Sequence, residues 1–186
     1  MATYQTKGII LKKTDQGEAD QLFIIYTQSH GKITALGRAT KKIKSKLSGN
    51  LKQFAIIDLM IAPGKNYSHI AAANIFVNFK KLEKDLKKII LASHSLELVD
   101  KMTKSEQGDQ EIFNLLCRYF NALDENLFKD EEWQIINQAF VIKLLAILGF
   151  NPTKDIADSP SKLRIFLKNH LNQELKTSHF LSKILA

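Results

Sequence analysis

The sequence contains a single cysteine, Cys117, among its 186 residues. An intramolecular disulfide and a zinc knuckle built from cysteine pairs both need more than one thiol, so both are excluded, and the composition fits a reducing compartment. Long apolar runs are also missing. No segment approaches the ~20 apolar residues of a membrane span, and the apolar run before Lys12 and Lys13 is too short for a signal peptide. We therefore expect a cytoplasmic protein without membrane contact.

Acidic residues are scarce near the N-terminus. The first 80 residues hold twelve Lys and Arg but only four acidic residues, namely Asp15, Glu18, Asp20 and Asp58, whereas residues 81–186 hold fifteen of each sign. The net charge of +8 at pH 7 therefore lies in the first part of the chain. A one-sided field of this kind indicates a polyanionic partner rather than a requirement of folding.

Short apolar runs separated by turn residues, the pattern of β-strands, fill this basic part. The five runs are Thr6–Lys13, Gln21–Thr27, Lys32–Ala39, Phe54–Ile61 and Ile70–Phe79. Ser29-His30-Gly31 is a tight hairpin signal between the second and third runs, and Pro63-Gly64 suits a type II turn in which Gly64 supplies the positive φ. The pattern predicts a small barrel, such as an OB-fold, over residues 1–80.

After Lys80 the apolar residues follow a helical period. Apolar stripes run from Leu82 to Val99 and from Ile112 to Leu127. A third helix begins at Asp130 and has Gly149 as its C-cap, and Ser159-Pro160 opens another that continues to Leu171. The predicted fold class is α+β: an all-β N-terminal OB-fold barrel, residues 1–80, followed by an all-α helical domain, residues 81–186.

The clearest sign of function is the stretch between Asp20 and Asp58, which contains no acidic residue. Its cations are Lys32, Arg38, Lys41, Lys42, Lys44, Lys46 and Lys52. Five of them fall between Arg38 and Lys46, in a polar segment between the third and fourth strands, where flexible ammonium groups can hold a phosphate backbone. A solubilising loop is the alternative, but a solvated surface usually mixes both signs of charge. We expect this stretch to bind nucleic acid, above all single-stranded DNA.

Proteins that bind single strands also stack bases on aromatic rings. Tyr26, Phe54 and Tyr67 are candidates, although a position in the core is the favoured interpretation for each. Tyr67 is the best of the three because it lies in a polar turn, residues 62–68, where a large ring has little reason to be unless it contacts something.

Patterns typical of catalysis are sparse. The five histidines are scattered, and the HExxH, GxxxxGK[ST] and GxSxG motifs are all missing. Glu18 and Asp20 are close in sequence, but a turn ordered by side-chain hydrogen bonds explains them better than acid–base chemistry. Cys117 lies on or beside an apolar stripe and is interpreted as a core thiol. We expect no enzymatic activity, no cofactor and no metal site.

Many residues along the chain also follow one another in an ordered pattern. In the N-terminal part they are Gly8, Lys12, Gly17, Glu18, Asp20, Leu22, Thr27, Gly31, Lys32, Gly37, Arg38, Lys44, Ser45, Leu47, Gly49, Leu51 and Phe54. Residues 140–152 form an apolar run that ends in Leu-Gly before a proline, and residues 175–181 carry a closing Leu-Lys segment. Together these features resemble the bacterial recombination mediator family RecO. Where many relatives carry a four-cysteine zinc site, residues 153–161 contain no cysteine, so the chain resembles a short form without zinc.

The resemblance implies a non-enzymatic, nucleoid-associated recombination mediator with an OB-fold and a helical domain. Such a protein binds single- and double-stranded DNA, anneals complementary strands and, with RecR, helps to load RecA onto DNA coated by single-strand-binding protein. The helical half would dock the acidic, apolar C-terminal tail of single-strand-binding protein, with Arg118, Lys143 or Arg164 as partners for its carboxylates. An OB-fold protein that binds structured RNA or the ribosome is the main alternative. An adaptor that contacts an acidic protein is the second.

Overall fold

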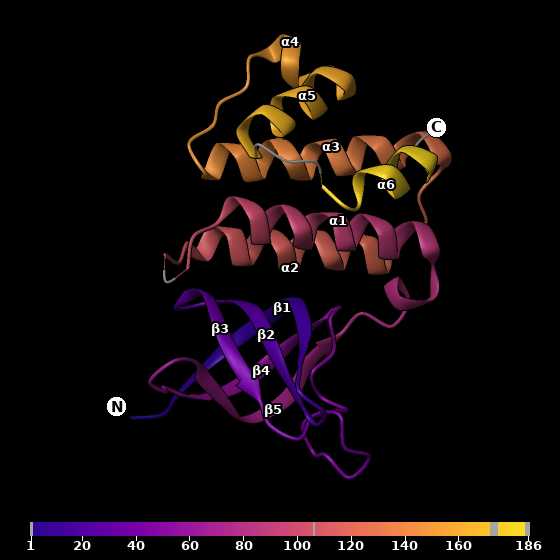
Figure 1. The fold of residues 1–186 in the computed structure, drawn as a ribbon. Helices are drawn as coiled ribbons and strands as arrows, with labels where there is room; N and C mark the ends of the chain where they lie inside the picture. The colour runs from indigo at the N-terminus through magenta and orange to yellow at the C-terminus, as the bar shows by residue number, and fades with distance from the viewer. Residues whose placement is uncertain (1, 106, 172–174, 185–186) are drawn as a thin grey trace. The chain divides into compact units, whose positions relative to one another are not determined.

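The computed structural model describes residues 2–105, 107–171 and 175–184 (Figure 1). The chain forms two compact units: residues 1–80 group with residues 103–114, and residues 81–102 group with residues 115–186. A short segment from beyond residue 100 therefore returns to the N-terminal unit. The division into domains at residue 80 stays a prediction.

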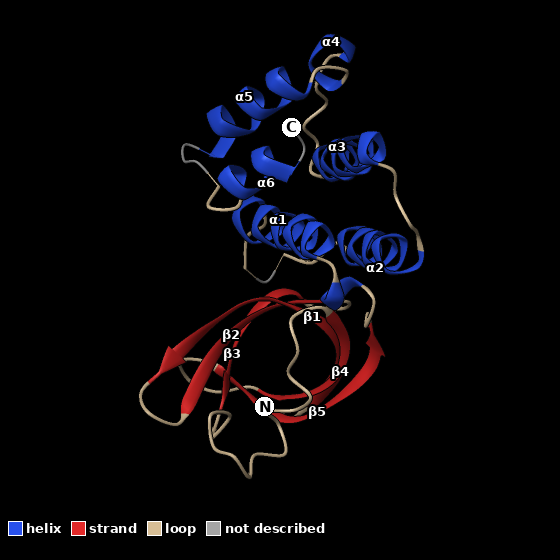
Figure 2. Cartoon of the chain, turned by 90° about the vertical axis from the view of Figure 1, so that its right-hand side faces the viewer, coloured by secondary structure: helices blue, strands red, loops and turns tan. Residues whose placement is uncertain are grey.

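Five strands form the N-terminal unit: β1 (Tyr4–Gln16), β2 (Asp20–Thr27), β3 (Gly31–Gly37), β4 (Ala55–Ala62) and β5 (Ser68–Asn78). They close into a barrel in the order β1-β2-β3-β5-β4, which Figure 2 shows as a ring of strands. Only β3 and β5 pair in parallel; the other neighbours are antiparallel. The barrel confirms the predicted OB-fold followed by helices, and closing it leaves no long strand edge exposed.

Alternation of side chains along the strands fills the barrel. On β3, Ile33 and Ala35 point into the core while Lys32 and Thr34 lie half-buried on the outer face. Phe23 and Ile25 on β2, together with other branched side chains, complete an interior that is almost fully shielded from water. Burial of one such side chain stabilises the fold by about 1.5–3 kcal/mol, so the barrel has a core of its own.

The predicted type of the turn at Pro63-Gly64 is wrong. Among the described residues, the glycines with positive φ are Gly17, Gly31 and Gly149, and Gly64 is not one of them. The β4–β5 turn instead needs glycine at position 64 because an added Cβ would collide with the main-chain carbonyl oxygen of Tyr67. The expectation of a type II turn at Pro63-Gly64 therefore fails, although the two residues do separate two strands.

The rest of the described chain is helical, as predicted. A 3-10 turn η1 (Leu82–Lys84) precedes α1 (Leu86–Met102), α2 (Gln110–Glu125), α3 (Asp130–Ile147), α4 (Lys154–Ala157), α5 (Pro160–Leu171) and α6 (Ser178–Ile184). The start of α3 at Asp130 is confirmed, and Gly149 takes a φ of 82° just beyond its end, the conformation of a helix C-cap. Among the residues that the structure describes, no helix is long and apolar enough to cross a membrane.

A polar network fixes the start of α6 against α1. Glu97 accepts hydrogen bonds from the backbone N–H groups of Lys176 and Thr177 and from the Thr177 hydroxyl, at 2.7–2.9 Å. Nδ1 of His94 lies 3.0 Å from Oγ1 of the same threonine. Because the imidazole is buried, its pKa falls from 6.5 to about 4, although the nearby Glu97 carboxylate opposes that shift. His94 is therefore neutral near pH 7.

Candidate nucleic-acid interface

One end of the barrel collects two of its connections. Because β1 pairs antiparallel with β2 and β4, and β2 pairs antiparallel with β3, the ends of β1 and β3 lie at the same end of the barrel as the beginnings of β2 and β4. The β1–β2 turn and the beginning of the β3–β4 connection therefore share this end. The end of β4 pairs with the beginning of β1, so the β4–β5 turn belongs to the other end, and Ser68, which follows this turn, pairs with Ala35 of β3. OB-folds bind oligonucleotides on the outer face of β2 and β3 and on the β1–β2 and β4–β5 loops. Residues at the first end are thus placed where such folds hold a strand.

The β3–β4 connection, residues 38–54, carries most of the predicted cations and is called the basic loop below. Its first leg is tied to the β1–β2 turn: the N–H of Ala39 donates to Oδ1 of Asp20 at 2.7 Å, and the N–H of Lys41 donates to the carbonyl of Ala19 at 3.0 Å. Asp20 thus orders the neighbouring loop rather than its own turn. At the other leg, Leu51 is buried in the barrel core and Leu47 packs against it. The basic loop is anchored at both legs and extends beyond the barrel between them (Figure 1).

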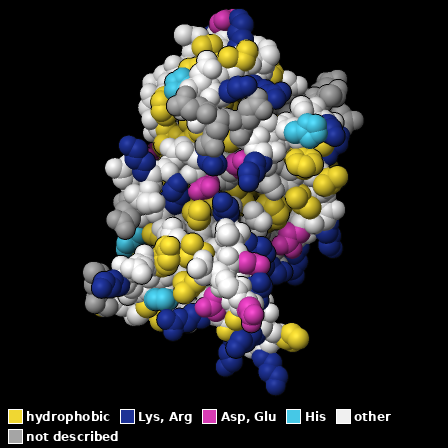
Figure 3. All heavy atoms as spheres, in the orientation of Figure 1, with side chains coloured by type: hydrophobic (Ala, Val, Ile, Leu, Met, Phe, Trp, Pro, Cys, Tyr) yellow, Lys and Arg dark blue, Asp and Glu magenta, His cyan; other side chains and the backbone are white. Residues whose placement is uncertain are grey.

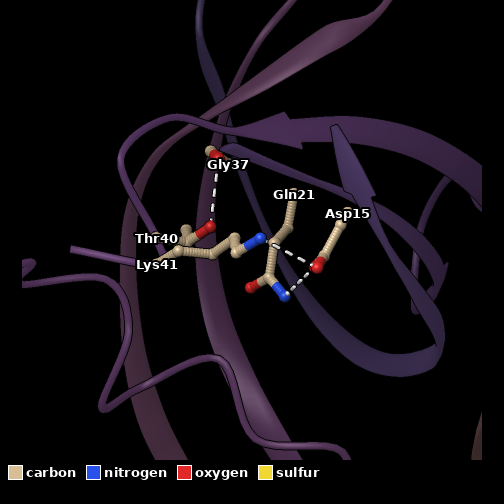
Figure 4. A network of polar contacts seen from close by, with 5 residues as sticks. All are labelled: Asp15, Gln21, Gly37, Thr40 and Lys41. Carbon is tan, nitrogen blue, oxygen red and sulfur yellow. Dashed lines mark hydrogen bonds and ion pairs between the residues drawn. The ribbon is translucent and has the colours of Figure 1, made fainter. Parts of the chain in front are cut away.

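Lys41 has a counter-charge that the sequence pattern did not reveal. Its Nζ lies 2.9 Å from Oδ2 of Asp15 near the end of β1, and the Gln21 amide donates to Oδ1 of the same carboxylate at 3.0 Å (Figure 4). The hydrogen bonds from Lys41 and Gln21 lower the pKa of Asp15, so the carboxylate is charged at neutral pH. The expectation of a loop without acidic partners is therefore wrong at Lys41.

The other predicted cations differ in accessibility. Arg38, Lys42, Lys44 and Lys46 are exposed, Lys52 is half-buried, and Lys32 is half-buried on the outer face of β3. Among the described residues, no acidic side chain pairs with Lys42, Lys44 or Lys46. Figure 3 shows Lys and Arg side chains gathered at the lower end of the barrel, with acidic side chains among them. The accessible positive charge thus lies on the outer part of the basic loop.

Two further lysines belong to this end of the barrel. Lys12 and Lys13 are exposed on the last part of β1, and Lys13 is close enough to Asp15 to help lower the pKa of that carboxylate. Sequence reasoning missed them because it ended the first strand at Lys13, whereas β1 continues to Gln16 after a bulge between Ile10 and Lys12. The only available signal was the pair of adjacent lysines itself.

The three candidate stacking rings have different environments. Tyr67, in the β4–β5 turn, is 46% exposed and open to a ligand, whereas Phe54 is half-buried. Tyr26 is fully buried, and its hydroxyl donates to the carbonyl oxygen of Asp109 and accepts from the N–H of the same residue, both at 3.1 Å. The core interpretation of Tyr26 is confirmed. The ring is covered because the segment around Asp109 lies on the outer face of β2.

That same segment also covers the turn between β2 and β3. Ser105 forms a parallel β-bridge with Lys32, and the backbone of Gly108 approaches Gly31 so closely that a Cβ on Gly31 would lie 2.5 Å from it. One end of the β2–β3 face is therefore closed to a strand of nucleic acid. The open parts of the candidate interface are the basic loop at the opposite end and the exposed Tyr67 ring of the β4–β5 turn.

Comparison with known proteins connects this arrangement to one family. Residues 1–79 match the model of the N-terminal part of recombination protein O, and residues 83–155 match the model of its C-terminal part. The chain belongs to the recombination protein O (RecO) family. The resemblance found in the ordered residues of the sequence is therefore confirmed.

Similar proteins with the name DNA repair protein RecO come from diverse bacteria. The relative from Clostridium perfringens strain 13 is 31% identical over 172 residues, which are 92% of this chain and 66% of the relative. The relative from Nostoc sp. PCC 7120 is 33% identical over 83% of this chain and 52% of its own length, and that from Thermoanaerobacter sp. X514 is 28% identical over 83% and 61%. The chain thus spans between about half and two thirds of the length of these RecO relatives.

The helical unit of this RecO-family chain contains a second candidate site, a cavity of about 290 Å³. Its walls are mainly apolar and come from α3, α5 and α6; they include Val141, Leu163, Leu167, Leu171 and Leu181. Arg164 and Lys168 on α5 also line it. Asn137 is 9% exposed, and its Oδ1 has no hydrogen-bond partner in the described part of the chain. The cavity therefore combines apolar walls, basic groups and one unsatisfied acceptor.

Only one of the three residues predicted to bind the tail of single-strand-binding protein lines this cavity. Arg164 lines it, whereas Arg118 on α2 and Lys143 on α3 are exposed and do not. The sequence could not make this distinction, because the three residues lie on three different helices whose packing brings only one of them to the cavity. The role of all three stays a prediction.

Proposed function

We propose that this chain acts in DNA repair and recombination as a non-enzymatic mediator that holds DNA at the end of its barrel that carries the basic loop. The observation that carries the proposal is the set of exposed cations Lys42, Lys44 and Lys46 on a loop anchored at both legs. Ammonium groups on flexible stems contact phosphates without reading base edges, so binding would be independent of sequence. Family membership and the names of the relatives support a role in repair.

The proposed activity includes both forms of DNA. Arg38, Lys12, Lys13 and the half-buried Lys32 and Lys52 would extend the contact with the backbone, and the exposed Tyr67 ring would stack a base of a single strand. Neutralising the phosphates of two strands at once lowers their repulsion, so annealing of complementary strands would follow from binding. Loading of RecA together with RecR is the further role that the RecO resemblance implies.

A salt titration with a labelled oligonucleotide tests the DNA-binding proposal. Each phosphate contact contributes about 0.7 to the slope of log K against log salt for a single strand. The triple variant Lys42→Gln, Lys44→Gln, Lys46→Gln should therefore lose about 2 from the magnitude of that slope and bind all sequences more weakly. The matched control, Lys84→Gln, Lys154→Gln, Lys183→Gln, removes three exposed lysines from the helical unit and should bind as the unmodified chain does.

Two outcomes would contradict the proposal. An unmodified chain whose affinity does not change with salt does not hold a phosphate backbone through these cations. A triple variant that binds as tightly as its control would make the basic loop a solubilising segment. Tighter binding of a matched RNA strand than of DNA would favour the alternative of an RNA-binding or ribosome-associated protein.

The cavity of the helical unit favours a second role, docking of the C-terminal tail of single-strand-binding protein. A tail with an apolar end and acidic residues matches apolar walls beside Arg164 and Lys168. An amide or hydroxyl of the tail can also donate to Oδ1 of Asn137, which otherwise lacks a partner. We include this partner in the proposed function, in the helical unit rather than the barrel.

Peptide titration of the full chain tests this second role. A peptide with the acidic, apolar tail sequence should bind, and Arg164→Ala should weaken its binding about tenfold or more, the usual effect of losing a charge-assisted contact. Arg118→Ala and Lys143→Ala are matched controls, since neither residue lines the cavity, and both should leave the affinity unchanged. Equal effects of all three substitutions would show that the peptide binds by general charge attraction and not in the cavity.

A further inference from the structure

The tip of the basic loop presents one large apolar side chain among its lysines. Ile43 is 103% exposed, more than any other of the large hydrophobic residues on the described surface. Its neighbours in sequence are Lys42 and Lys44, both exposed. An isoleucine in full contact with water contributes no hydrophobic stabilisation to the fold, because apolar side chains stabilise a protein only when they leave water.

The backbone fixes where this side chain lies. The N–H of Ser45 donates to the carbonyl of Lys42 at 3.0 Å, which closes a turn with Ile43 and Lys44 at its two central positions. The central residues of such a turn project outward. The two legs of the loop are anchored, one to the β1–β2 turn and the other to the barrel core. The position of the turn that contains Ile43 is therefore restrained from both sides. Ile43 thus lies fully exposed at a turn of the basic loop, between two cations.

We propose that Ile43 is a wedge that inserts between neighbouring bases of the DNA held by the basic loop, while Lys42 and Lys44 contact the phosphates on either side. The inference rests on the proposed DNA binding and adds a function for a residue that phosphate contacts leave unused. Apolar side chains of this kind enter between base steps, unstack them and bend the strand. Flanking lysines place the wedge at the stack because phosphates lie on both sides of every base step.

The size of the apolar surface favours DNA over a protein partner. A stable protein interface buries about 800 Å² on each side, which one isolated side chain in a charged loop cannot supply. A single branched side chain does fill the gap that opens when two bases unstack. An anionic membrane is the other surface that attracts lysines around an apolar residue, and it enters the test as a rival.

The wedge predicts which DNA the loop prefers. Unstacking costs least where the stack is already interrupted, as in single strands, gaps and mismatches, and most in an intact duplex. The substrate class is therefore DNA with interrupted stacking, such as the edge of a single-stranded gap. Lysines alone would not select such an edge, since phosphate contacts carry no information about stacking and the duplex has the higher charge density.

A fluorescent base analogue placed at the edge of a gap tests the wedge. The fluorescence of 2-aminopurine rises when its neighbours unstack, so the unmodified chain should brighten it on binding. Ile43→Ser should abolish the rise and weaken binding to gapped DNA about three- to tenfold, the effect of losing one apolar contact, whereas Ile43→Leu should retain both. The salt slope should be the same for all three proteins, because no cation is removed. Leu127→Ser is the matched control: Leu127 is 95% exposed on the helical unit, and its removal should change neither readout.

The results separate the wedge from the DNA binding on which it rests. If the unmodified chain binds gapped DNA with a steep salt slope but Ile43→Ser brightens the analogue equally, the wedge is overturned and the proposed function stands. If the unmodified chain fails to bind DNA at all, both are overturned. If Ile43→Ser loses affinity for anionic phospholipid vesicles while its DNA signals are unchanged, the residue serves a membrane surface and the wedge is again overturned.

Discussion

At the scale of single residues, the contact between Asp15 and Lys41 sets how much of the basic loop is available to an anion. Both side chains are largely exposed, with 60% of the aspartate and 35% of the lysine side chain open to solvent, so the pair contributes little to folding stability. Its effect is on binding, because a lysine engaged by a carboxylate must release it before it contacts a phosphate. If the basic loop holds DNA as proposed, Asp15 competes with DNA for Lys41.

Asp15→Asn should tighten DNA binding several-fold and make the salt slope for a single strand more negative by up to about 0.7, since one more cation meets the phosphates. Fluorescence anisotropy across a salt series measures both quantities. Asp58→Asn is a matched control, because Asp58 is exposed in the middle of β4 and the substitution changes the net charge equally. If the two variants tighten binding to the same extent, general attraction and not the release of Lys41 is the cause.

His94 makes the stability of the chain depend on pH. Its pKa is about 4 in the folded state and 6.5 for a histidine open to water, so the unfolded chain binds more protons between these values. The contribution of neutral His94 to folding stability is fully present above pH 6.5. It is lost as the pH falls toward 4, by about 1.4 kcal/mol per pH unit. Urea unfolding at pH 7, 6 and 5 should show the unmodified chain losing more stability than His94→Gln, by about 1 kcal/mol between pH 6 and 5. Parallel losses in the two proteins would show that His94 does not resist protonation in the fold.

At the scale of elements, the turn between β2 and β3 carries a close contact that glycine alone permits. Gly31 has a φ of 63°, and an added Cβ would lie 2.5 Å from Gly108. Gly31→Ala should therefore lower the free energy of unfolding in two ways. Holding alanine in the left-handed conformation costs about 1–2 kcal/mol, and the clash of its Cβ with Gly108 costs a further ~1–3 kcal/mol. Gly17→Ala is the matched control, since Gly17 has a φ of 70° with nothing within 4 Å of the added Cβ and should cost only the first amount. Urea denaturation of both variants measures the difference, and equal losses would mean that the segment around Gly108 does not pack on the turn.

The elements themselves were predictable, because they depend on local patterns. Alternating apolar residues gave all five strands, and the start of α3 at Asp130 and the helix end at Gly149 followed from residue types near those positions. Features that depend on distant parts of the chain were not predictable. Tyr26 meets Asp109 across 83 positions, and Lys41 meets Asp15 across 26, and no periodicity relates such residues.

The candidate sites were predictable only in part, for the same reason. Composition located the cations of the basic loop. It could not show that Lys41, unlike Lys42, Lys44 and Lys46, forms an ion pair, because that contact depends on where β1 places Asp15 in the fold. In the helical unit, charge alone could not separate Arg164 from Arg118 and Lys143. The packing of α5 and α6 against α1 and α3 forms the cavity that Arg164 lines.

At the scale of the whole molecule, the two candidate sites belong to different compact units. The basic loop lies in the unit that contains residues 1–80, and the cavity beside Arg164 lies in the unit that contains residues 115–186. The chain also separates its charge in this way, with the excess of cations in the first 80 residues. Contact with DNA and contact with a DNA-coating protein would therefore be independent, and variants at the two sites should have additive effects.

Strand annealing on naked and coated DNA tests this independence. The triple variant Lys42→Gln, Lys44→Gln, Lys46→Gln should anneal complementary strands more slowly on every template, because it weakens the hold on the backbone. Arg164→Ala should slow annealing only where the strands are coated with single-strand-binding protein that carries its tail, and should match the unmodified chain on naked strands and on strands coated with a tailless form. Combining the substitutions should multiply the two defects on tail-bearing templates. A defect of Arg164→Ala on naked DNA would assign the cavity residue to DNA binding and would remove the reason for treating the two units as separate sites.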